Sequence, residues 1–279
     1  MALVLMYITN EPEVAKIAQK YGVDRVWVDL EYKGKDIRQA GMSSVKNHHT
    51  VEDVKAIRKV ITSSEVLVRI NPWNAESIDE INSVINAGAD SIMLPMWKTL
   101  NEVSLFVNSV GNRAKKVLLL ETKEAVDCLE DVLQLSGIDE IHIGLNDLHL
   151  SYGLSFMFQL VSNGTVESII SKIKTKGIPY GFGGIARIGE GRIPAEMIVM
   201  EHYRMGSTRA ILSRSFCDYS KISDKSELDN VFKENIHKLR EFEKKISSVG
   251  DEEFSKNKTL LELAVAGIVD NSVIKKKGE

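Results

Sequence analysis

The stretch LLLETKEAVD, residues 118–127, joins a run of apolar residues to a single carboxylate, Glu121, and then to a helical pattern. The stretch IHIGLNDLHL, residues 141–150, repeats this order and leads to Asp147. Short, nearly continuous apolar runs are typical of strands that are buried on both faces of a parallel sheet. Each carboxylate could cap the helix that follows its strand, or the two together could bind a metal ion.

The same order of strand and helix recurs along the chain. We expect strands at residues 3–9, 25–31, 65–71, 90–96, 116–122, 140–146, 180–186 and 209–216. Helical patterns follow these strands, and the last one is a long charged helix at residues 226–246. This order predicts an α/β protein with a (β/α)8 TIM barrel. A doubly wound open sheet is the alternative, but residues 9–15 lack the glycine-rich phosphate fingerprint expected after its first strand.

The pattern also predicts how the chain is divided. We expect a barrel catalytic domain at residues 1–250 and a C-terminal helical extension at residues 251–279 that packs on the barrel or on a neighbouring subunit. Within the extension we expect one amphipathic helix at about residues 257–269. Earlier in the chain, one helical pattern runs from residue 123 to Gly137.

Composition excludes several classes of protein. With 36 basic and 39 acidic residues among 279, the chain has no electrostatic footprint for nucleic acid or for an anionic membrane. No apolar stretch approaches the ~20 residues that cross a bilayer, and the apolar N-terminal run lacks the basic flank of a signal peptide, so we expect a cytoplasmic protein. Cys128 and Cys217 cannot form a disulfide framework, and we expect both to act as small core hydrophobes.

In a barrel of this kind the active site lies at the C-terminal ends of the strands. The polar residues found there should converge on one mouth, and they are Asp29, Glu31, Arg69, Asn71, Glu121, Asn146, Asp147 and Arg214. Two connections on the same side are prominent. Residues 32–49 are longer than a compact barrel needs, and residues 183–192 are rich in glycine.

Four segments, in order along the predicted strands, resemble motifs of the HpcH/HpaI aldolase and citrate lyase family. The segment VDLEY (28–32) resembles the family's Asp-x-Glu-His segment, and VRINPWN (68–74) resembles its substrate-arginine strand. ETKEAVD (121–127) and GLNDLHLSYG (144–153) resemble the segments that carry its two metal carboxylates. The resemblance runs from about residue 2 to residue 216. It implies a metal-dependent class II aldolase or carbon–carbon lyase, and a homo-oligomer, that joins or separates a pyruvate-like 2-keto acid and an aldehyde or similar acceptor.

Carried over residue by residue, the resemblance implies that Glu121 and Asp147 bind a divalent ion, Mg²⁺ or Mn²⁺. Hard cations of this kind accept one or two carboxylates together with water and substrate oxygens. Arg69 would stabilise the enolate oxygen that develops when the carbon–carbon bond forms or breaks. Backbone amides near Asn146 and Asp147 would bind the substrate carboxylate.

The resemblance also implies that Asp29 and Glu31 orient water bound to the metal. Two other readings stay open, in which Arg69 forms an ion pair with Glu31 inside the barrel, or Asp29 caps a helix. The chain departs from the family where a His–Asp pair supplies the base, because Tyr32 and Asn86 stand at the matching positions. Tyrosine is a poor base at neutral pH, although it can donate a proton.

Histidines of the long connection could replace the missing base. His48 and His49 directly precede Thr50, which we expect to cap the next helix, and a histidine is well suited to proton transfer near neutral pH. The alternative is that both are exposed turn residues. His149, two residues after Asp147, is a second candidate.

Gly183 and Gly184 begin a glycine-rich connection of the type that binds phosphate through backbone amides in such barrels. Arg187 and Arg192 flank it, so a phosphorylated or otherwise acidic acceptor could bind there. A lid with glycine hinges or a plain turn is the alternative. For the whole chain, the alternatives to an aldolase are a barrel that binds metal and keto acid without turnover, and a related lyase acting on phosphoenolpyruvate or an acyl thioester.

Overall fold

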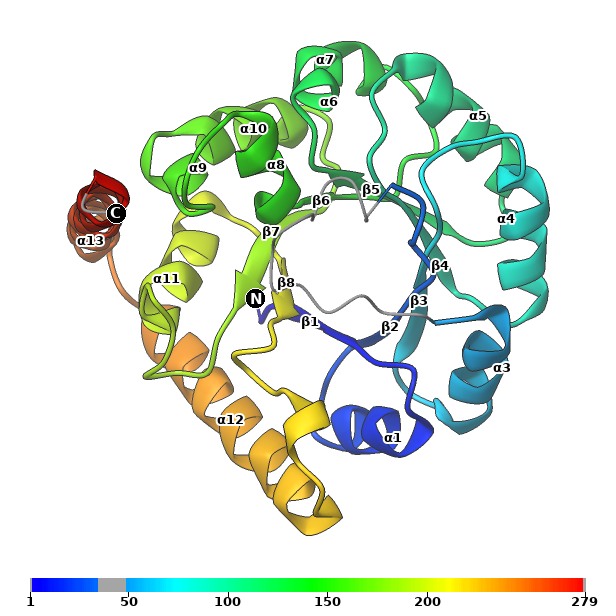
Figure 1. Cartoon of the computed structure of the whole chain (residues 1–279), viewed down its shortest axis with the longest axis horizontal. Helices are drawn as coiled ribbons and strands as arrows, with labels where there is room; N and C mark the ends of the chain where they lie inside the picture. The colour runs from blue at the N-terminus through cyan, green and yellow to red at the C-terminus, as the bar shows by residue number, and fades with distance from the viewer. Residues whose placement is uncertain (1, 35–48, 278–279) are drawn as a thin grey trace.

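The computed structural model describes residues 2–34 and 49–277 and has a closed barrel of eight parallel strands surrounded by helices (Figure 1). The strands are β1 Val4–Ile8, β2 Arg25–Asp29, β3 Glu65–Arg69, β4 Ser91–Leu94, β5 Lys115–Leu120, β6 Glu140–Ile143, β7 Tyr180–Ile185 and β8 Arg209–Leu212. Each strand pairs with the next, and β1 closes the barrel on β8. The predicted (β/α)8 TIM barrel is confirmed.

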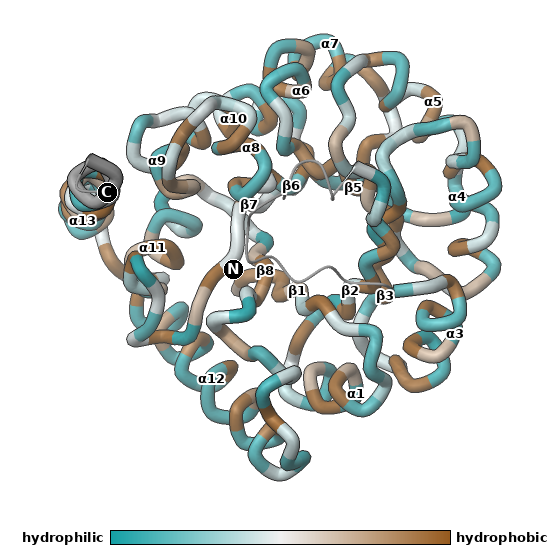
Figure 2. Tube along the Cα trace, viewed as in Figure 1, coloured by the Kyte–Doolittle hydropathy of each residue, from teal (hydrophilic) through white to brown (hydrophobic). Residues whose placement is uncertain are grey.

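Helices cover the outside of the barrel, with hydrophobic and hydrophilic residues alternating along them (Figure 2). In the first half of the chain they are α1 Pro12–Lys20, α3 Val51–Val60, α4 Ser77–Asn86, α5 Leu100–Val110, α6 Lys123–Asp127 and α7 Leu129–Val132. In the second half they are α8 Leu145–Ser151, α9 Gln159–Ser162, α10 Thr165–Lys174, α11 Ala195–Met205, α12 Lys225–Ile246 and α13 Asp251–Lys277, with a 3-10 turn at Tyr219–Lys221. None of the helices in the described residues has both the length and the apolarity needed to cross a membrane.

Several helices differ from the sequence prediction. Helix α8 begins at Leu145, inside the strand expected at residues 140–146, and α9 was not predicted. The pattern that starts at residue 123 is interrupted at Cys128, which ends α6 and precedes α7. Its thiol donates to the carbonyl oxygens of Lys98 and Ala125, so this side chain is tied to the neighbouring connection. Helix α13 is longer than the expected residues 257–269, because acidic residues in its first turn favour helix formation before the apolar face begins.

The inside of the barrel is closed at the end where the strands begin. Side chains that face inward fill its middle, namely Met6, Trp27, Leu67, Met93, Val117 and Leu119. Toward the start of the strands, buried Glu140 accepts from Arg25 and from Arg209 at 2.7 Å each. These paired charged side chains fill this end of the barrel and seal it, and the pairing compensates their burial. The opposite end, where the strands finish, is left open to a ligand.

Candidate active site

A cavity of about 530 Å³ lies at the C-terminal ends of the strands. Most of the polar residues expected at the mouth line it, namely Asp29, Arg69, Glu121, Asn146, Asp147 and Arg214, while Glu31 and Asn71 do not. Gly183, Gly184 and Arg192 of the glycine-rich connection line it as well. These residues come from strands and connections spread over nearly the whole chain. A cavity of this size and mixed polarity is typical of a binding site for a small molecule.

Arg69, the last residue of β3, is held by two carboxylates. Its Nε donates to Asp29 Oδ1 and its Nη2 to Asp29 Oδ2, both at 2.8 Å, and Nη2 lies 3.2 Å from Glu31 Oε2. The guanidinium lies over the ring of Trp27, 5.1 Å from its centroid. Parallel pairing of β2 and β3 sets Asp29 opposite Arg69. Asp29 therefore fixes the arginine and caps none of the described helices, and the ion pair of Arg69 with Glu31 forms as well.

Glu121 follows β5 and is buried, with an exposed fraction of 3%. Its Oε1 accepts the backbone N–H of Met96 at 3.1 Å. Burial raises the pKa of the Glu121 carboxyl well above its usual range, and the nearby charges of Glu31 and Asp147 raise it further. This carboxylate is therefore held at a place where its negative charge is poorly compensated.

Asp147 lies in the first turn of α8, which begins directly after β6 and Gly144. A Cβ at Gly144 would lie 2.8 Å from Glu121 Oε2, so glycine leaves this oxygen uncovered. Within residues 2–34 and 49–277, no three His, Cys, Asp or Glu side chains gather closely enough to hold an ion by themselves. A pair of carboxylates, with water and substrate oxygens completing the shell, still suits Mg²⁺ or Mn²⁺. A cation would also compensate the buried charge of Glu121, so the residues fit the expected ion.

The residues that replace the family's base pair lie apart. Tyr32 is 58% exposed, and its side chain does not line the cavity. Its backbone N–H donates to Asn71 Oδ1, as does that of Lys33, so Asn71 fixes the start of the long connection. Asn86 is the last residue of α4 and precedes β4. It therefore lies at the sealed end of the barrel, opposite the mouth.

His49 lies beside the site, although it does not line the cavity. Its Nδ1 accepts the backbone N–H of Asp29 at 3.0 Å. A neutral imidazole that accepts at Nδ1 carries its proton on Nε2, which makes Nε2 a donor in this state. His149 Nδ1 lies 3.1 Å from the carbonyl oxygen of Leu145 within its own helix. His48 falls outside the described residues.

The glycines of β7 have packing roles that are visible in the structure. A Cβ at Gly181 would lie 2.4 Å from the carbonyl oxygen of Arg209 on β8, so the two strands approach too closely for a side chain. Gly183 has a φ of 54°, and its carbonyl oxygen lies 3.1 Å from His142 Nε2. A Cβ at Gly183 would also collide with Leu145. Arg187 does not line the cavity, because its Nε donates to the carbonyl of Phe216.

The sequence reasoning missed two parts of the site. Trp27 forms part of the cavity wall beneath Arg69, and its Nε1–H has no partner among the described residues. Its position could have been read from the alternation along β2, where Trp27 shares the inward face with Asp29. The other part is an apolar wall formed by Phe156, Met157 and Phe158, in a segment without strand or helix periodicity that gave no signal.

The chain is similar to known proteins over most of its length. The family model described as HpcH/HpaI aldolase/citrate lyase matches residues 3–176. A curated hydroxypyruvate/pyruvate aldolase from Roseovarius nubinhibens is 22% identical over 207 residues, which are 61% of this chain and 73% of that protein.

Two solved structures have the same fold. One is an HpcH/HpaI aldolase/citrate lyase family protein from Burkholderia cenocepacia J2315, with a TM-score of 0.60 and 15% identity, over 77% of this chain and 90% of that chain. The other is an HpcH/HpaI aldolase from Desulfitobacterium hafniense DCB-2, also with a TM-score of 0.60 and 15% identity, over 90% of this chain and 95% of that chain. At this identity the two likenesses concern the fold.

Proposed function

Because the chain belongs to the HpcH/HpaI aldolase/citrate lyase family, we propose that it is a class II aldolase, a metal-dependent carbon–carbon lyase that acts through the enolate of a pyruvate-like 2-keto acid. One observation carries the proposal. A buried carboxylate, Glu121, shares a cavity with Asp147 and with the fixed guanidinium of Arg69. A pair of carboxylates beside a fixed cation suits a substrate whose oxygens become more negative during the reaction.

Glu121 and Asp147 would hold the divalent ion, which when bound would act as a Lewis acid toward the keto oxygen of the substrate. Arg69 would stabilise the enolate oxygen. Its Nη1 has no hydrogen bond among the described residues, so this nitrogen is available to a substrate oxygen while Asp29 holds the other two. The backbone N–H groups near Asn146 and Asp147, in the first turn of α8, would bind the substrate carboxylate.

The proposed reaction also needs a base and a proton donor. In the direction of synthesis, a base removes a proton from the methyl carbon of the keto acid, and that carbon forms a bond to the carbonyl carbon of the aldehyde. The aldehyde oxygen then takes up a proton, and cleavage reverses these steps. His49 Nε2–H suits the donor of this second proton better than the base, given the contact of Nδ1 with Asp29. We retain His48 as the base and Tyr32 as a second proton donor.

Exchange of the pyruvate methyl protons in D₂O tests the proposal without knowledge of the acceptor. We expect exchange that requires Mg²⁺ or Mn²⁺ and that falls by about 100-fold or more in Glu121→Gln and Asp147→Asn, the size of effect seen when an electrostatic stabiliser is lost. Glu124→Gln is the matched control, because Glu124 is a half-exposed carboxylate of the same segment paired with Lys98.

Two results would contradict parts of the proposal. Unchanged Mn²⁺ affinity in both Glu121→Gln and Asp147→Asn, measured by calorimetry, would remove the metal assignment. Absence of exchange with every divalent ion tested would favour the second candidate, a barrel that binds metal and keto acid without turnover. The exposed Tyr32 in place of the family's histidine is the observation that favours this candidate.

A further inference from the structure

Glu31, the second carboxylate that holds Arg69, lies outside the strands of the barrel. β2 ends at Asp29, and Leu30 N–H still donates to the carbonyl oxygen of Arg69 at 2.9 Å. Residues 30–34 belong to no strand or helix. The Glu31 carboxylate, 3.2 Å from Arg69 Nη2, therefore depends on contacts other than strand pairing to hold the backbone around it.

Asn71, two residues after Arg69, holds this backbone. Its Oδ1 accepts the N–H groups of two successive residues, Tyr32 at 3.1 Å and Lys33 at 3.0 Å. The Asn71 side chain is buried, and it does not line the cavity. The end of β3 thus carries both the arginine and the amide that fixes the segment of its second carboxylate.

Glu80, in the first half of α4, fixes the orientation of the Asn71 amide. Asn71 Nδ2 donates to Glu80 Oε1 at 2.8 Å, and the backbone N–H of Asn71 donates to Oε2 at 3.2 Å. The amide presents its oxygen to Tyr32 and Lys33 only while its nitrogen faces Glu80. The ion pair of Lys33 with the exposed Glu76 adds little to this link, because water screens it.

The place of Glu31 matters to Arg69 because Asp29 alone leaves one motion open. The two hydrogen bonds to Asp29 fix Nε and Nη2 of the arginine, but the guanidinium can still tilt about the line that joins these atoms. Contact with Glu31 and with the ring of Trp27, 5.1 Å away, limits the tilt. A displaced Glu31 would therefore change the direction of Nη1, the nitrogen proposed above to meet the enolate oxygen.

We propose that Asn71 and Glu80 are positioning residues for the reaction, which hold Glu31 and, through it, the guanidinium of Arg69 in the orientation that the enolate oxygen needs. This inference rests on the proposed function. Such residues affect the rate without touching the substrate, because a group that stabilises developing charge must be held within about 0.5 Å of its productive place.

Asn71→Asp tests the link at a single bond. The new carboxylate still accepts from Tyr32 and Lys33, but it places a second negative charge against Glu80 where Nδ2 had donated. We expect kcat for exchange of the pyruvate methyl protons to fall about tenfold with little change in KM, because the enolate oxygen develops only after pyruvate has bound.

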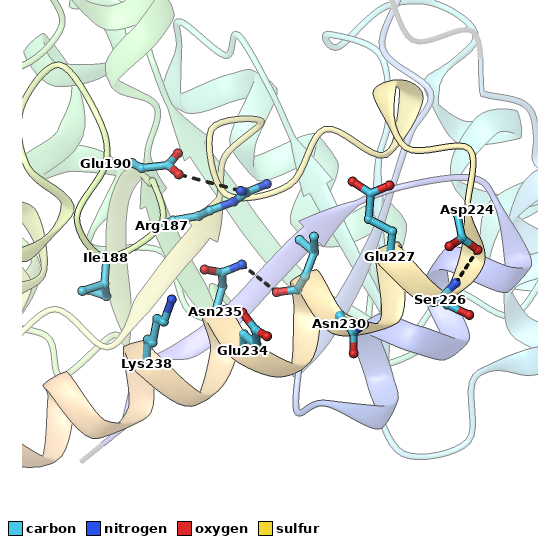
Figure 3. A pocket seen from close by; sticks show the side chains of 11 residues that line it. Arg187, Ile188, Glu190, Asp224, Ser226, Glu227, Asn230, Glu234, Asn235 and Lys238 are labelled. Carbon is cyan, nitrogen blue, oxygen red and sulfur yellow. Dashed lines mark hydrogen bonds and ion pairs between the residues drawn. The ribbon is translucent and has the colours of Figure 1, made fainter.

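Asn235→Asp is the matched control. Asn235 is buried to a similar degree, with an exposed fraction of 8% against 4% for Asn71. Its Nδ2 donates to the carbonyl of Val231 at 2.7 Å, in the separate groove along α12 (Figure 3). This variant makes the same chemical change in a buried amide that has no contact with Arg69, so exchange of pyruvate protons should be unchanged.

Combining Asn71→Asp with Glu80→Gln restores the link with its direction reversed. The new amide donates to the new carboxylate, and the pair keeps a single negative charge. We expect this combined variant to recover most of the loss in kcat. Glu80→Ala breaks the same link from α4 and takes the place of Asn71→Asp if that variant does not fold, with the same expected fall.

The Nε–H group of Arg69 reports the position of the arginine without turnover. In the parent we expect an NMR signal, absent from Arg69→Lys, that exchanges slowly with water because Nε–H donates to the buried Asp29. Its exchange with water should be about tenfold faster in Asn71→Asp, return toward the parent rate in the combined variant, and be unchanged in Asn235→Asp.

The two measurements separate this inference from the proposed function. An unchanged Arg69 signal in Asn71→Asp overturns the inference, and so does unchanged exchange of pyruvate protons in a variant whose Arg69 signal has changed. If the parent exchanges no pyruvate protons, the proposed function fails on its own test. The Arg69 signal then decides by itself whether Asn71 positions the arginine, since faster exchange with water supports this and an unchanged rate overturns it.

Discussion

Single residues at the mouth show how strongly a side chain's role depends on its partners. The sequence identified Arg69 and Asp29 as polar residues at the ends of adjacent strands, but it left three roles open for them. Parallel register places the two side chains opposite each other, and the resulting pair of 2.8 Å hydrogen bonds gives Asp29 a partner that none of these readings named. A residue pattern cannot decide this, because an arginine binds whichever carboxylate the fold brings nearest. The expected contact of Asp29 with water bound to the metal stays a prediction.

Met96 is the one non-glycine residue with positive φ in the described chain, at 53°, and its N–H donates to Glu121. Such a conformation costs an L-residue about 1–2 kcal/mol, which glycine avoids. We therefore expect Met96→Gly to be more stable to unfolding by urea than Met96→Ala, by about 1 kcal/mol. At ordinary positions alanine is the more stable of the two, so the reverse order would show that residue 96 is not strained.

At the scale of elements, the strand periodicity was sufficient to predict all strands, while details of pairing were not. The glycines of β7 were read as a possible phosphate loop. In the structure, Gly181 lets β7 and β8 approach, and the register of the pair shifts between Gly181 and Gly184. Both Gly183 and Gly184 still line the cavity, so their predicted contact with substrate stays a prediction. Sequence alone does not distinguish a glycine needed for packing from one needed for a ligand.

β6 and α11 carry two fully buried histidines that should make folding sensitive to acid. Burial lowers the pKa of His142 to about 4 and that of His202 to about 3, against a usual value of 6.5. Between these values the unfolded chain binds protons that the native chain does not. The free energy of unfolding should therefore fall as the pH falls from about 6.5 toward 4, by up to about 1.4 kcal/mol per pH unit for each histidine.

Urea denaturation of His202→Phe at pH 7 and pH 5 tests this expectation. Phenylalanine keeps the stacking on Phe182, where the ring centroids are 3.9 Å apart, but it loses the hydrogen bond to Ser207. The variant should be less stable at pH 7, by about 1 kcal/mol, and should lose less stability than the parent on acidification. The exposed His237 supplies the control, and an equal effect of His237→Gln would rule out the buried site as the cause.

At the scale of the whole molecule, α13 has one face that packs on the barrel and another apolar face that has no partner within the described chain. Leu261 and Val265 are buried, and Asn257 donates to Met197 and to Glu201 on α11, so one face of α13 packs on the barrel. The prediction of a separate extension at residues 251–279 stays a prediction. On another face, Leu260 and Leu263 are 53% and 65% exposed. Exposed apolar side chains one turn apart are typical of a contact surface.

We expect this face to join two copies of the chain in a homo-oligomer. The double variant Leu260→Glu with Leu263→Glu should raise the dissociation constant at least tenfold, about 1.4 kcal/mol, in sedimentation velocity. Leu105→Glu, at a 40% exposed position on α5, is the control. A parent that sediments as a monomer would contradict the expectation.

The sequence by itself determined the barrel, the approximate positions of its strands, and most of the polar residues at its mouth. These follow from the alternation of apolar runs with helical patterns, which is a local property, and from the rule that parallel strands end on one side. Only the tertiary structure decided that Asp29 holds Arg69, that Asn86 lies at the sealed end, and that Arg192 enters the cavity while Arg187 does not. Such facts depend on strand register, on the path of connections, and on competition among side chains for partners, and these arise only when segments distant in sequence are packed together.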